Sequence, residues 1–285
     1  MIFTPDYNNL VIAAKNKKPP RTPLYEHNIS PHIMEKVLNN NFTPLLNGNQ
    51  NDVKEYFKNF CEFFKLMGYD TVSFEGCVTT ALVGGGSLGS HKPPTIKDKA
   101  DFEKYPWEEI LDRYKTIYAK QFEALREVMP AGMKIVGGVG NGVFEVVQDL
   151  VSYTELCYMS IDEPELYADI FKTVGKMNLS IWKWFLAEYG DICAVARFGD
   201  DLGYKSGTLL SPIDTKKYII PEYKPIIDEV HRYGKPFLLH SCGCIFDVME
   251  DIIAVGVDAK HSNEDQIALF PEWSKRYGDC LAFFG

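Results

Sequence analysis

The apolar positions of this chain follow two spacings, one typical of amphipathic helices and one typical of buried strands. Residues 52–67 carry aromatic and aliphatic side chains at helical spacing, and Asp52 can cap the start of this helix. Gly68 ends the helix, and residues 69–75 follow as a short strand. The same order of helix, glycine and short apolar run recurs, so it predicts six returns from helix to strand. The glycines before the expected strands are Gly68, Gly132, Gly190, Gly234, Gly256 and Gly278.

Strands that alternate with helices indicate a parallel sheet, either doubly wound or closed into a barrel. The glycine-rich run at residues 137–142 lacks the spacing of a dinucleotide-binding turn, which favours the barrel. With residues 21–27 as a first strand, the chain supplies six strands and the beginning of a seventh at residues 281–284. We therefore expect an α/β TIM barrel over residues 21–285 that lacks its last strand or strands, preceded by an N-terminal arm at residues 1–20. A barrel with such an open edge should be aggregation-prone, or a fragment of a longer gene product.

Composition and charge narrow the class of protein. The chain of 285 residues is 46% hydrophobic and 24% charged, as in soluble globular proteins. Its net charge of −9 argues against a general surface for nucleic acid or anionic membranes. It has no apolar run long enough to span a bilayer, and its first residues lack the pattern of a signal peptide. Seven cysteines without framework spacing suit a reducing compartment, so we expect a cytoplasmic protein.

The carboxyl ends of the expected strands carry polar or ionisable groups, whereas the strand bodies are apolar. In a barrel these ends meet at one face, where such proteins hold their active sites. The contrast therefore predicts a pocket at this face. The candidate site residues, in chain order, are Glu75, Asn141, Arg197, Asp200, Asp201, His240, Cys242 and His261.

His240 and Cys242 form the sharpest pair, because residues two apart on a strand project from the same face. Zinc accepts an imidazole and a thiolate, and catalytic zinc normally has three protein ligands. The alternative is a buried histidine that is hydrogen-bonded to the backbone, beside a cysteine that acts as a small core residue. Third-ligand candidates within the chain are Cys244, Cys77, Glu75 and His261.

The remaining candidates also allow two interpretations. Asp200 and Asp201 could grip a substrate, or one could cap a helix while its neighbour is solvated. His261 could bind a metal, donate a proton or merely fill a strand end. Glu75 could equally be functional or structural.

Several of these motifs together suggest a known family. They are Pro20-Arg-Thr-Pro-Leu-Tyr25, Gly84-Gly-Gly-Ser-Leu88, Arg197-Phe-Gly-Asp-Asp-Leu-Gly203, Leu210-Ser-Pro212 with Pro221-Glu-Tyr223, and His240-Ser-Cys-Gly243. With them the chain resembles the uroporphyrinogen decarboxylase superfamily, and within it the branch of cobalamin-dependent, zinc-dependent methyltransferases. The tail Phe283-Phe-Gly285 is similar to the start of a Gly-Gly-Ile-Asp strand end in that family.

The resemblance implies a distorted (β/α)8 barrel and a zinc ion held by His240, Cys242 and a further cysteine that would lie beyond Gly285. It implies methyl transfer between a corrinoid such as methylcobalamin, usually on a carrier protein, and a small thiol or similar acceptor. In that hypothesis, Glu75, Asp200, Asp201 and His261 would orient the substrate or tune the metal. Asn141 and Arg197 would bind the cofactor.

Two other functions stay open at this point. The first is a metal-free decarboxylase that grips a multiply carboxylated tetrapyrrole with arginines. The chain lacks the Met-Arg-Gln-Ala-Gly-Arg motif of that enzyme, and only Arg21 and Arg197 are expected near a pocket. The second is a non-catalytic barrel that binds a corrinoid or another tetrapyrrole.

Overall fold

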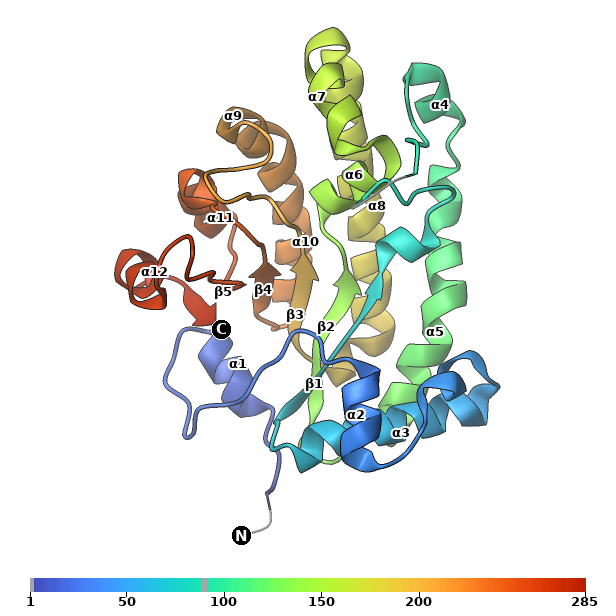
Figure 1. Ribbon diagram of the computed structural model, residues 1–285, viewed down its shortest axis with the longest axis vertical. Coiled ribbons are helices and arrows are strands. Elements are labelled where there is room, and N and C mark those ends of the chain that lie inside the picture. The colour runs from blue at the N-terminus through green and yellow to red at the C-terminus, as the bar shows by residue number, and fades with distance from the viewer. Residues whose placement is uncertain (1–2, 89–91) are drawn as a thin grey trace.

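The computed structural model describes residues 3–88 and 92–285, and within them six parallel strands form one sheet in chain order (Figure 1). Each strand pairs in parallel with the next, and helices return the chain from one strand to the following one. This is the arrangement of a distorted TIM barrel, as the sequence predicted, but the sheet has six strands and does not include the first of the strands counted from the sequence. The strands are β1 (Thr71–Cys77), β2 (Lys134–Gly140), β3 (Cys193–Gly199), β4 (Phe237–His240), β5 (Ala259–His261) and β6 (Ala282–Phe284).

Helices surround the sheet and connect its strands (Figure 1). Three of them, α3, α5 and α8, are long, and α5 packs against both of the others outside the sheet. The helices are α1 (Asn8–Ala14), α2 (Pro31–Leu38), α3 (Gln50–Leu66), α4 (Lys99–Lys104), α5 (Ile110–Val128), α6 (Val143–Val151), α7 (Tyr153–Asp162), α8 (Pro164–Tyr189), α9 (Pro212–Asp214), α10 (Ile220–Arg232), α11 (Met249–Ala254) and α12 (Phe270–Tyr277). None of the helices in the described residues is long and apolar enough to cross a membrane.

The six predicted returns from helix to strand are confirmed, because each expected glycine precedes one strand of the sheet. The reason for glycine holds at four of them, where φ is positive and a side chain would be strained. Gly190 and Gly278 have φ of −60° and −63°, which any residue can adopt, so the backbone does not require glycine there. The start of α3 also differs from the expectation: Asn49 caps it, and Asp52 completes a capping box.

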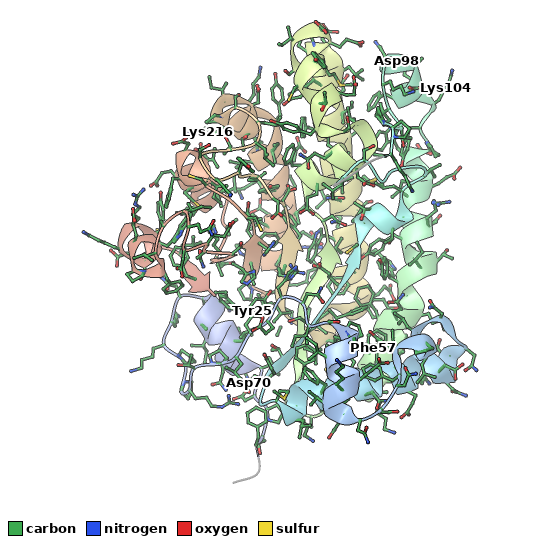
Figure 2. The ribbon with its side chains drawn as sticks, viewed as in Figure 1. Tyr25, Phe57, Asp70, Asp98, Lys104 and Lys216 are labelled. Carbon is green, nitrogen blue, oxygen red and sulfur yellow. The ribbon has the colours of Figure 1, made fainter. Side chains whose placement is uncertain are left out.

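The prediction of a first strand at residues 21–27 was wrong. This segment runs beside β1 and is tied to it by the Ser73 hydroxyl, which donates to the carbonyl of Glu26, but it forms no strand of the sheet. Pro23 has no backbone N–H to contribute to a ladder. Tyr25, which is labelled in Figure 2, instead packs edge-on against Phe284, with ring centroids 5.3 Å apart.

The apolar core has two parts, one on each face of the sheet. The larger part lies between the strands and the outer helices. The smaller part fills the inside of the barrel, where Leu10 and Ala14 of α1 meet Val195, Leu238 and the other inward residues of the strands. Both α1 residues are 0% exposed. The segment expected as an N-terminal arm therefore carries a helix that fills part of the barrel.

Candidate metal centre

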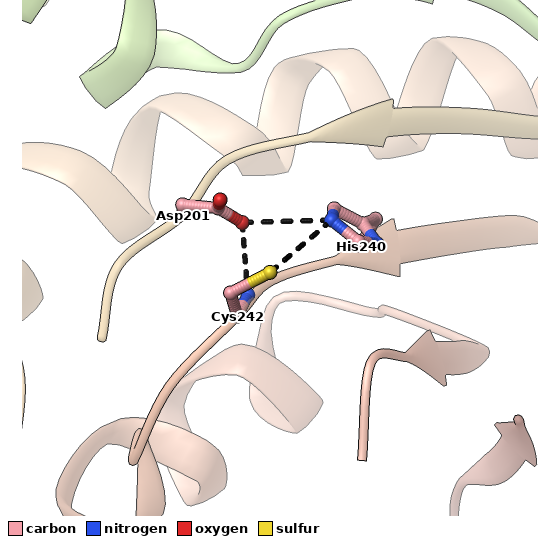
Figure 3. Close-up of side chains that lie close together, drawn as sticks. All are labelled: Asp201, His240 and Cys242. Atoms are coloured by element: carbon pink, nitrogen blue, oxygen red, sulfur yellow. Dashed lines mark hydrogen bonds and ion pairs between the residues drawn. The ribbon is translucent and has the colours of Figure 1, made fainter. Parts of the chain in front are cut away.

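His240 and Cys242 lie together at the carboxyl end of β4, and Asp201 reaches them from the segment after β3 (Figure 3). Nε2 of His240 is 3.5 Å from Sγ of Cys242 and 3.6 Å from Oδ1 of Asp201. The same carboxylate oxygen accepts a hydrogen bond of 2.9 Å from the backbone N–H of Cys242. Because β3 and β4 are neighbours in the sheet, their ends bring these three side chains into one cluster.

The three donor atoms fit a zinc ion by type and by spacing. Sulfur, imidazole nitrogen and carboxylate oxygen are all zinc ligands. Zinc bonds of about 2.0–2.3 Å in a tetrahedron place neighbouring ligand atoms about 3.3–3.8 Å apart. The two measured separations of 3.5 and 3.6 Å lie in that range, and all three atoms are within 4.8 Å of one another. The metal-ligand residues would be Asp201, His240 and Cys242.

Asp201 is in the position of the third metal ligand, for which the sequence had suggested four other residues. Cys244 belongs to the next turn, where its N–H donates to the carbonyl of Tyr204 at 2.6 Å. Burial raises the pKa of the Cys77 thiol to about 12, and this residue lines a separate cavity. Glu75 is paired with Arg197, and His261 contacts the ring of His240. No sequence motif identifies Asp201 as a partner of Cys242, because the contact joins two different strand ends.

His240 belongs to a stack of three imidazoles, formed by His27, His240 and His261 and called the histidine stack below. His27 lies parallel to His240, with ring centroids 4.6 Å apart and planes at 20°. His261, at the end of β5, has its Nδ1 atom 2.7 Å from Nδ1 of His240. His27 comes from the segment before α2, and the sequence gave no reason to place it here.

The histidine stack is neutral at ordinary pH. Burial lowers the pKa of His27 and of His240 to about 4, and that of His261 to about 3. The positive charge of Arg197 lowers all three pKa values further, and the neighbouring imidazoles lower those of His240 and His261. Neutral imidazole is the form that binds a metal ion.

The Cys242 thiol also contacts the hydroxyl of Ser262, the residue after His261. The hydroxyl of Ser262 donates to Sγ of Cys242 at 3.3 Å. Burial raises the pKa of Cys242 to about 11, while this hydrogen bond lowers it. Without a metal ion, the sulfur is therefore a thiol at neutral pH.

Asp200, the residue after β3, is not part of this cluster and instead caps the start of α6. It is 0% exposed and accepts hydrogen bonds from the backbone N–H groups of Phe144 and Glu145, at 3.0 and 2.8 Å, in the first turn of α6. The hydroxyl of Tyr223 donates to it at 2.5 Å. Burial raises the pKa of Asp200, and these hydrogen bonds lower it. This position matches the capping alternative, with Asp201 as the more exposed neighbour.

Glu145 is a site residue that the sequence interpretation missed. Its carboxylate accepts from the N–H of Asp201 at 3.3 Å and from Nδ2 of Asn141 at 2.8 Å, so it holds the segment that carries Asp201. Burial and the charge of Asp200 raise the pKa of Glu145 to about 8. Its place in the first turn of the helix after β2 could have indicated it, since that turn adjoins the strand ends.

Asn141 joins two segments at the end of β2. Its backbone is left-handed, with φ of 64°. Its Oδ1 accepts from the hydroxyl of Thr79 at 3.0 Å, and its Nδ2 donates to Glu145. Asn141 thus braces the strand end, and its predicted role in cofactor binding stays a prediction.

Glu75 and Arg197 form an ion pair inside the barrel. The Arg197 side chain is 2% exposed, and its Nη1 atom lies 3.5 Å from Nε2 of His27. Both residues and His27 line a cavity of about 260 Å³. The other walls are largely aromatic, from Tyr56, Phe60, Phe64 and Phe74. None of the metal-ligand residues lines this cavity, but His27, which does, stacks on His240, so the cavity lies beside the site.

Fold and site together define a TIM-barrel protein with a sulfur–nitrogen–oxygen donor set at adjacent strand ends. The family model of Uroporphyrinogen decarboxylase (URO-D) matches residues 47–285, and the chain belongs to this family. The resemblance noted in the sequence is thereby confirmed. Among solved structures, a methyltransferase from Methanosarcina mazei is similar, with a TM-score of 0.77 and 16% identity over 99% of this chain and 83% of that chain. At this identity the likeness concerns the fold. None of the curated proteins gives a significant match.

Proposed function

We propose that this chain is a methyltransferase that moves a methyl group between a corrinoid, such as methylcobalamin, and a small thiol or similar acceptor. The observation that carries the proposal is the donor set of Asp201, His240 and Cys242, whose spacing suits zinc. The similar fold of the Methanosarcina mazei methyltransferase supports the reaction class. A bound zinc ion would supply the positive charge that keeps an acceptor thiol in its nucleophilic thiolate form.

The residues of the chain prepare this chemistry in distinct ways. Asp201, His240 and Cys242 would hold the ion, and the hydrogen bond from the Cys242 N–H to Asp201 fixes two of these ligands relative to each other. Glu145 steadies the Asp201 segment. Burial of the histidine stack keeps water from the side of the ring opposite to the ligands.

The cavity next to the site limits the acceptor. Its volume of about 260 Å³ is below the ~300–1,000 Å³ of pockets for drug-sized ligands, so it suits a small molecule. The charges of Glu75 and Arg197 balance each other there, which does not favour a polyanion. A corrinoid is far larger than this cavity, so we expect it to approach from the open face of the barrel, on a carrier protein.

A decarboxylase is the second candidate, because the family model bears that name. Such an enzyme needs free guanidinium groups for a multiply carboxylated tetrapyrrole. All six arginines of this chain have partners within it. Five are paired with carboxylates, and Arg113 donates to the carbonyl of Ala81. These contacts favour the methyltransferase.

Metal binding is the first test. We expect the purified chain to bind one equivalent of Zn²⁺ or Co²⁺, with a sulfur-to-cobalt charge-transfer band for the cobalt form. Cys242→Ser should abolish that band, whereas Cys280→Ser, a change at an exposed cysteine between α12 and β6, should leave it intact. No stoichiometric metal, or the same spectrum for both variants, would remove the zinc hypothesis.

Activity is the second test. The zinc-loaded chain should convert methylcobalamin to its demethylated form in the presence of mercaptoethanol, which the visible spectrum of the corrinoid reports. A chelator should stop the reaction, and added zinc should restore it. Release of carbon dioxide from uroporphyrinogen in the presence of chelator would instead identify the decarboxylase.

A further inference from the structure

A row of polar contacts runs from Ser262 through the metal-ligand residues to His261. The hydroxyl of Ser262 lies 3.3 Å from Sγ of Cys242, and this sulfur lies 3.5 Å from Nε2 of His240. On the other side of the ring, Nδ1 of His240 lies 2.7 Å from Nδ1 of His261. The row thus connects the ends of β4 and β5 through both nitrogens of one imidazole.

The short contact between the two Nδ1 atoms requires one shared proton. Two protons would face each other at 2.7 Å, and two lone pairs would repel, so one nitrogen donates and the other accepts. If His240 donates, its Nε2 is bare and faces Cys242 and Asp201. If His261 donates, the proton of His240 sits on Nε2 and occupies the direction in which a metal ion would bind.

The surroundings favour donation by His240. The hydroxyl of Ser262 donates to Sγ, so the S–H of Cys242 is free to donate to Nε2 of His240. Each contact in the row then has one donor and one acceptor, and every donor points from Ser262 toward His261. The opposite arrangement turns an N–H toward Sγ and toward Asp201 Oδ1, which at 3.6 Å is too far for a good hydrogen bond.

We propose that His261 is a positioning residue whose Nδ1 accepts the Nδ1 proton of His240 and thereby keeps Nε2 of His240 as the metal-binding nitrogen. The inference rests on the proposed metal centre and adds the residue that prepares it. Ligating histidines usually donate their second N–H to a carboxylate, carbonyl or water. Here the acceptor is a second imidazole, which in turn must carry its own proton on Nε2.

His27 and Tyr25 hold the two rings in this arrangement. His27 stacks on His240, and Tyr25 meets His261 edge-on with ring centroids 5.2 Å apart. Arg197 can only donate, so its 3.5 Å contact makes Nε2 of His27 the acceptor and places the proton of His27 on Nδ1. The geometry therefore assigns a tautomer to each ring of the histidine stack: Nδ1–H in His27 and His240, and Nε2–H in His261.

Nitrogen NMR of the metal-free wild-type chain reads these tautomers directly. Long-range proton–nitrogen spectra of protein labelled at its six histidines distinguish a bare ring nitrogen from a protonated one. Assignment comes from the loss of one signal set in each single variant. We expect Nδ1–H for His240 and Nε2–H for His261, and the reverse pair of tautomers would overturn the inference.

Cobalt binding gives a second readout. His261→Phe removes the acceptor and should weaken Co²⁺ binding about 10–100-fold. His261→Asn, whose side-chain oxygen can occupy the place of Nδ1, should restore most of the affinity. His231→Asn is the matched control, since His231 pairs with Asp258 at the far side of β4 and should not affect binding. Equal affinity of wild type and His261→Phe would overturn the inference.

The two readouts separate this inference from the proposed function. A wild-type chain that binds no Co²⁺ would remove the metal centre, while the tautomers measured in the same metal-free chain would still decide the role of His261. A chain that binds Co²⁺ but shows Nε2–H on metal-free His240 would keep the metal centre and overturn the role of His261.

Discussion

The buried ion pair between Glu75 and Arg197 is a point at which the loss of one charge should be costly. In Glu75→Gln the Arg197 guanidinium, 2% exposed, keeps its charge without a carboxylate. Its other contact is a neutral imidazole nitrogen at 3.5 Å, and its Nε has no hydrogen-bond partner. Breaking a buried pair in this way costs about 3–5 kcal/mol. Because glutamine keeps an amide oxygen that can accept a hydrogen bond, we expect the lower end, about 3 kcal/mol.

Urea unfolding followed by tryptophan fluorescence measures this free energy, and the chain has four tryptophans to report it. The loss corresponds to a fall in Tm of about 6–12 °C for a domain of this size. Arg197→Met in the Glu75→Gln background removes the stranded charge, so the double variant should show a coupling free energy of at least about 1 kcal/mol.

The exposed pair of Glu272 and Arg276 is the matched control. Both side chains are nearly half exposed, at 46% and 47%, so Glu272→Gln should change the free energy of unfolding by less than about 0.5 kcal/mol. If Glu75→Gln costs no more than Glu272→Gln, the reasoning about a buried charge is refuted. Glu75 would then be free to act on a substrate, as the sequence interpretation allowed.

Three further predictions concern the frame of the site. Asp200→Asn turns an N–H toward the backbone donors of α6 and should lower the free energy of unfolding by about 2–3 kcal/mol. The control Asp98→Asn, at the exposed cap of α4, should be nearly neutral, and equal unfolding midpoints for the two variants would contradict the capping role of Asp200. In Gly243→Ala the added Cβ would lie 2.2 Å from the carbonyl carbon of Gly203, on a backbone with φ of 82°, so the variant should lose both stability and Co²⁺ affinity. In the control Gly207→Ala the added Cβ meets no atom within 4 Å, so neither property should change. Between pH 6.5 and about 4, the histidine stack of the folded metal-free chain binds fewer protons than the same histidines in the unfolded chain. The free energy of unfolding should therefore fall as the pH drops through this window. A free energy of unfolding that does not change with pH there would show that these rings are not buried as neutral groups.

Much of the fold follows from local signals. The alternation of helical stripes, glycines and short apolar runs was enough to place all six strands and their parallel order. Residues 21–27 were wrongly predicted as a strand because a short extended segment has the same local sequence pattern whether or not it pairs with a neighbouring strand. Local signals also do not reveal that the chain turns more widely at Thr215–Ile219 and then continues as α10, with Pro221 in its first turn and Pro225 in its interior.

The site was predictable to the extent that it lies at strand ends. His240 and Cys242 share a strand, so their common face follows from the spacing alone. Their places at strand ends identified Asp201 and His261 as candidate site residues, but did not show which groups they contact. His27 and Glu145 were not found, because they come from an irregular segment and from a helix turn that carry no motif.

The sequence by itself determined which strands form, in what order they lie, and that polar groups gather at one end of them. These properties depend on local periodicity and on the rule that parallel strands end at the same face. Only the tertiary structure decided that Asp200 caps α6 while Asp201 meets Cys242, and that one imidazole faces a thiol on one side and a second imidazole on the other. Adjacent residues in a chain can point in opposite directions, and the partner of each is chosen by packing between segments that are distant in the sequence.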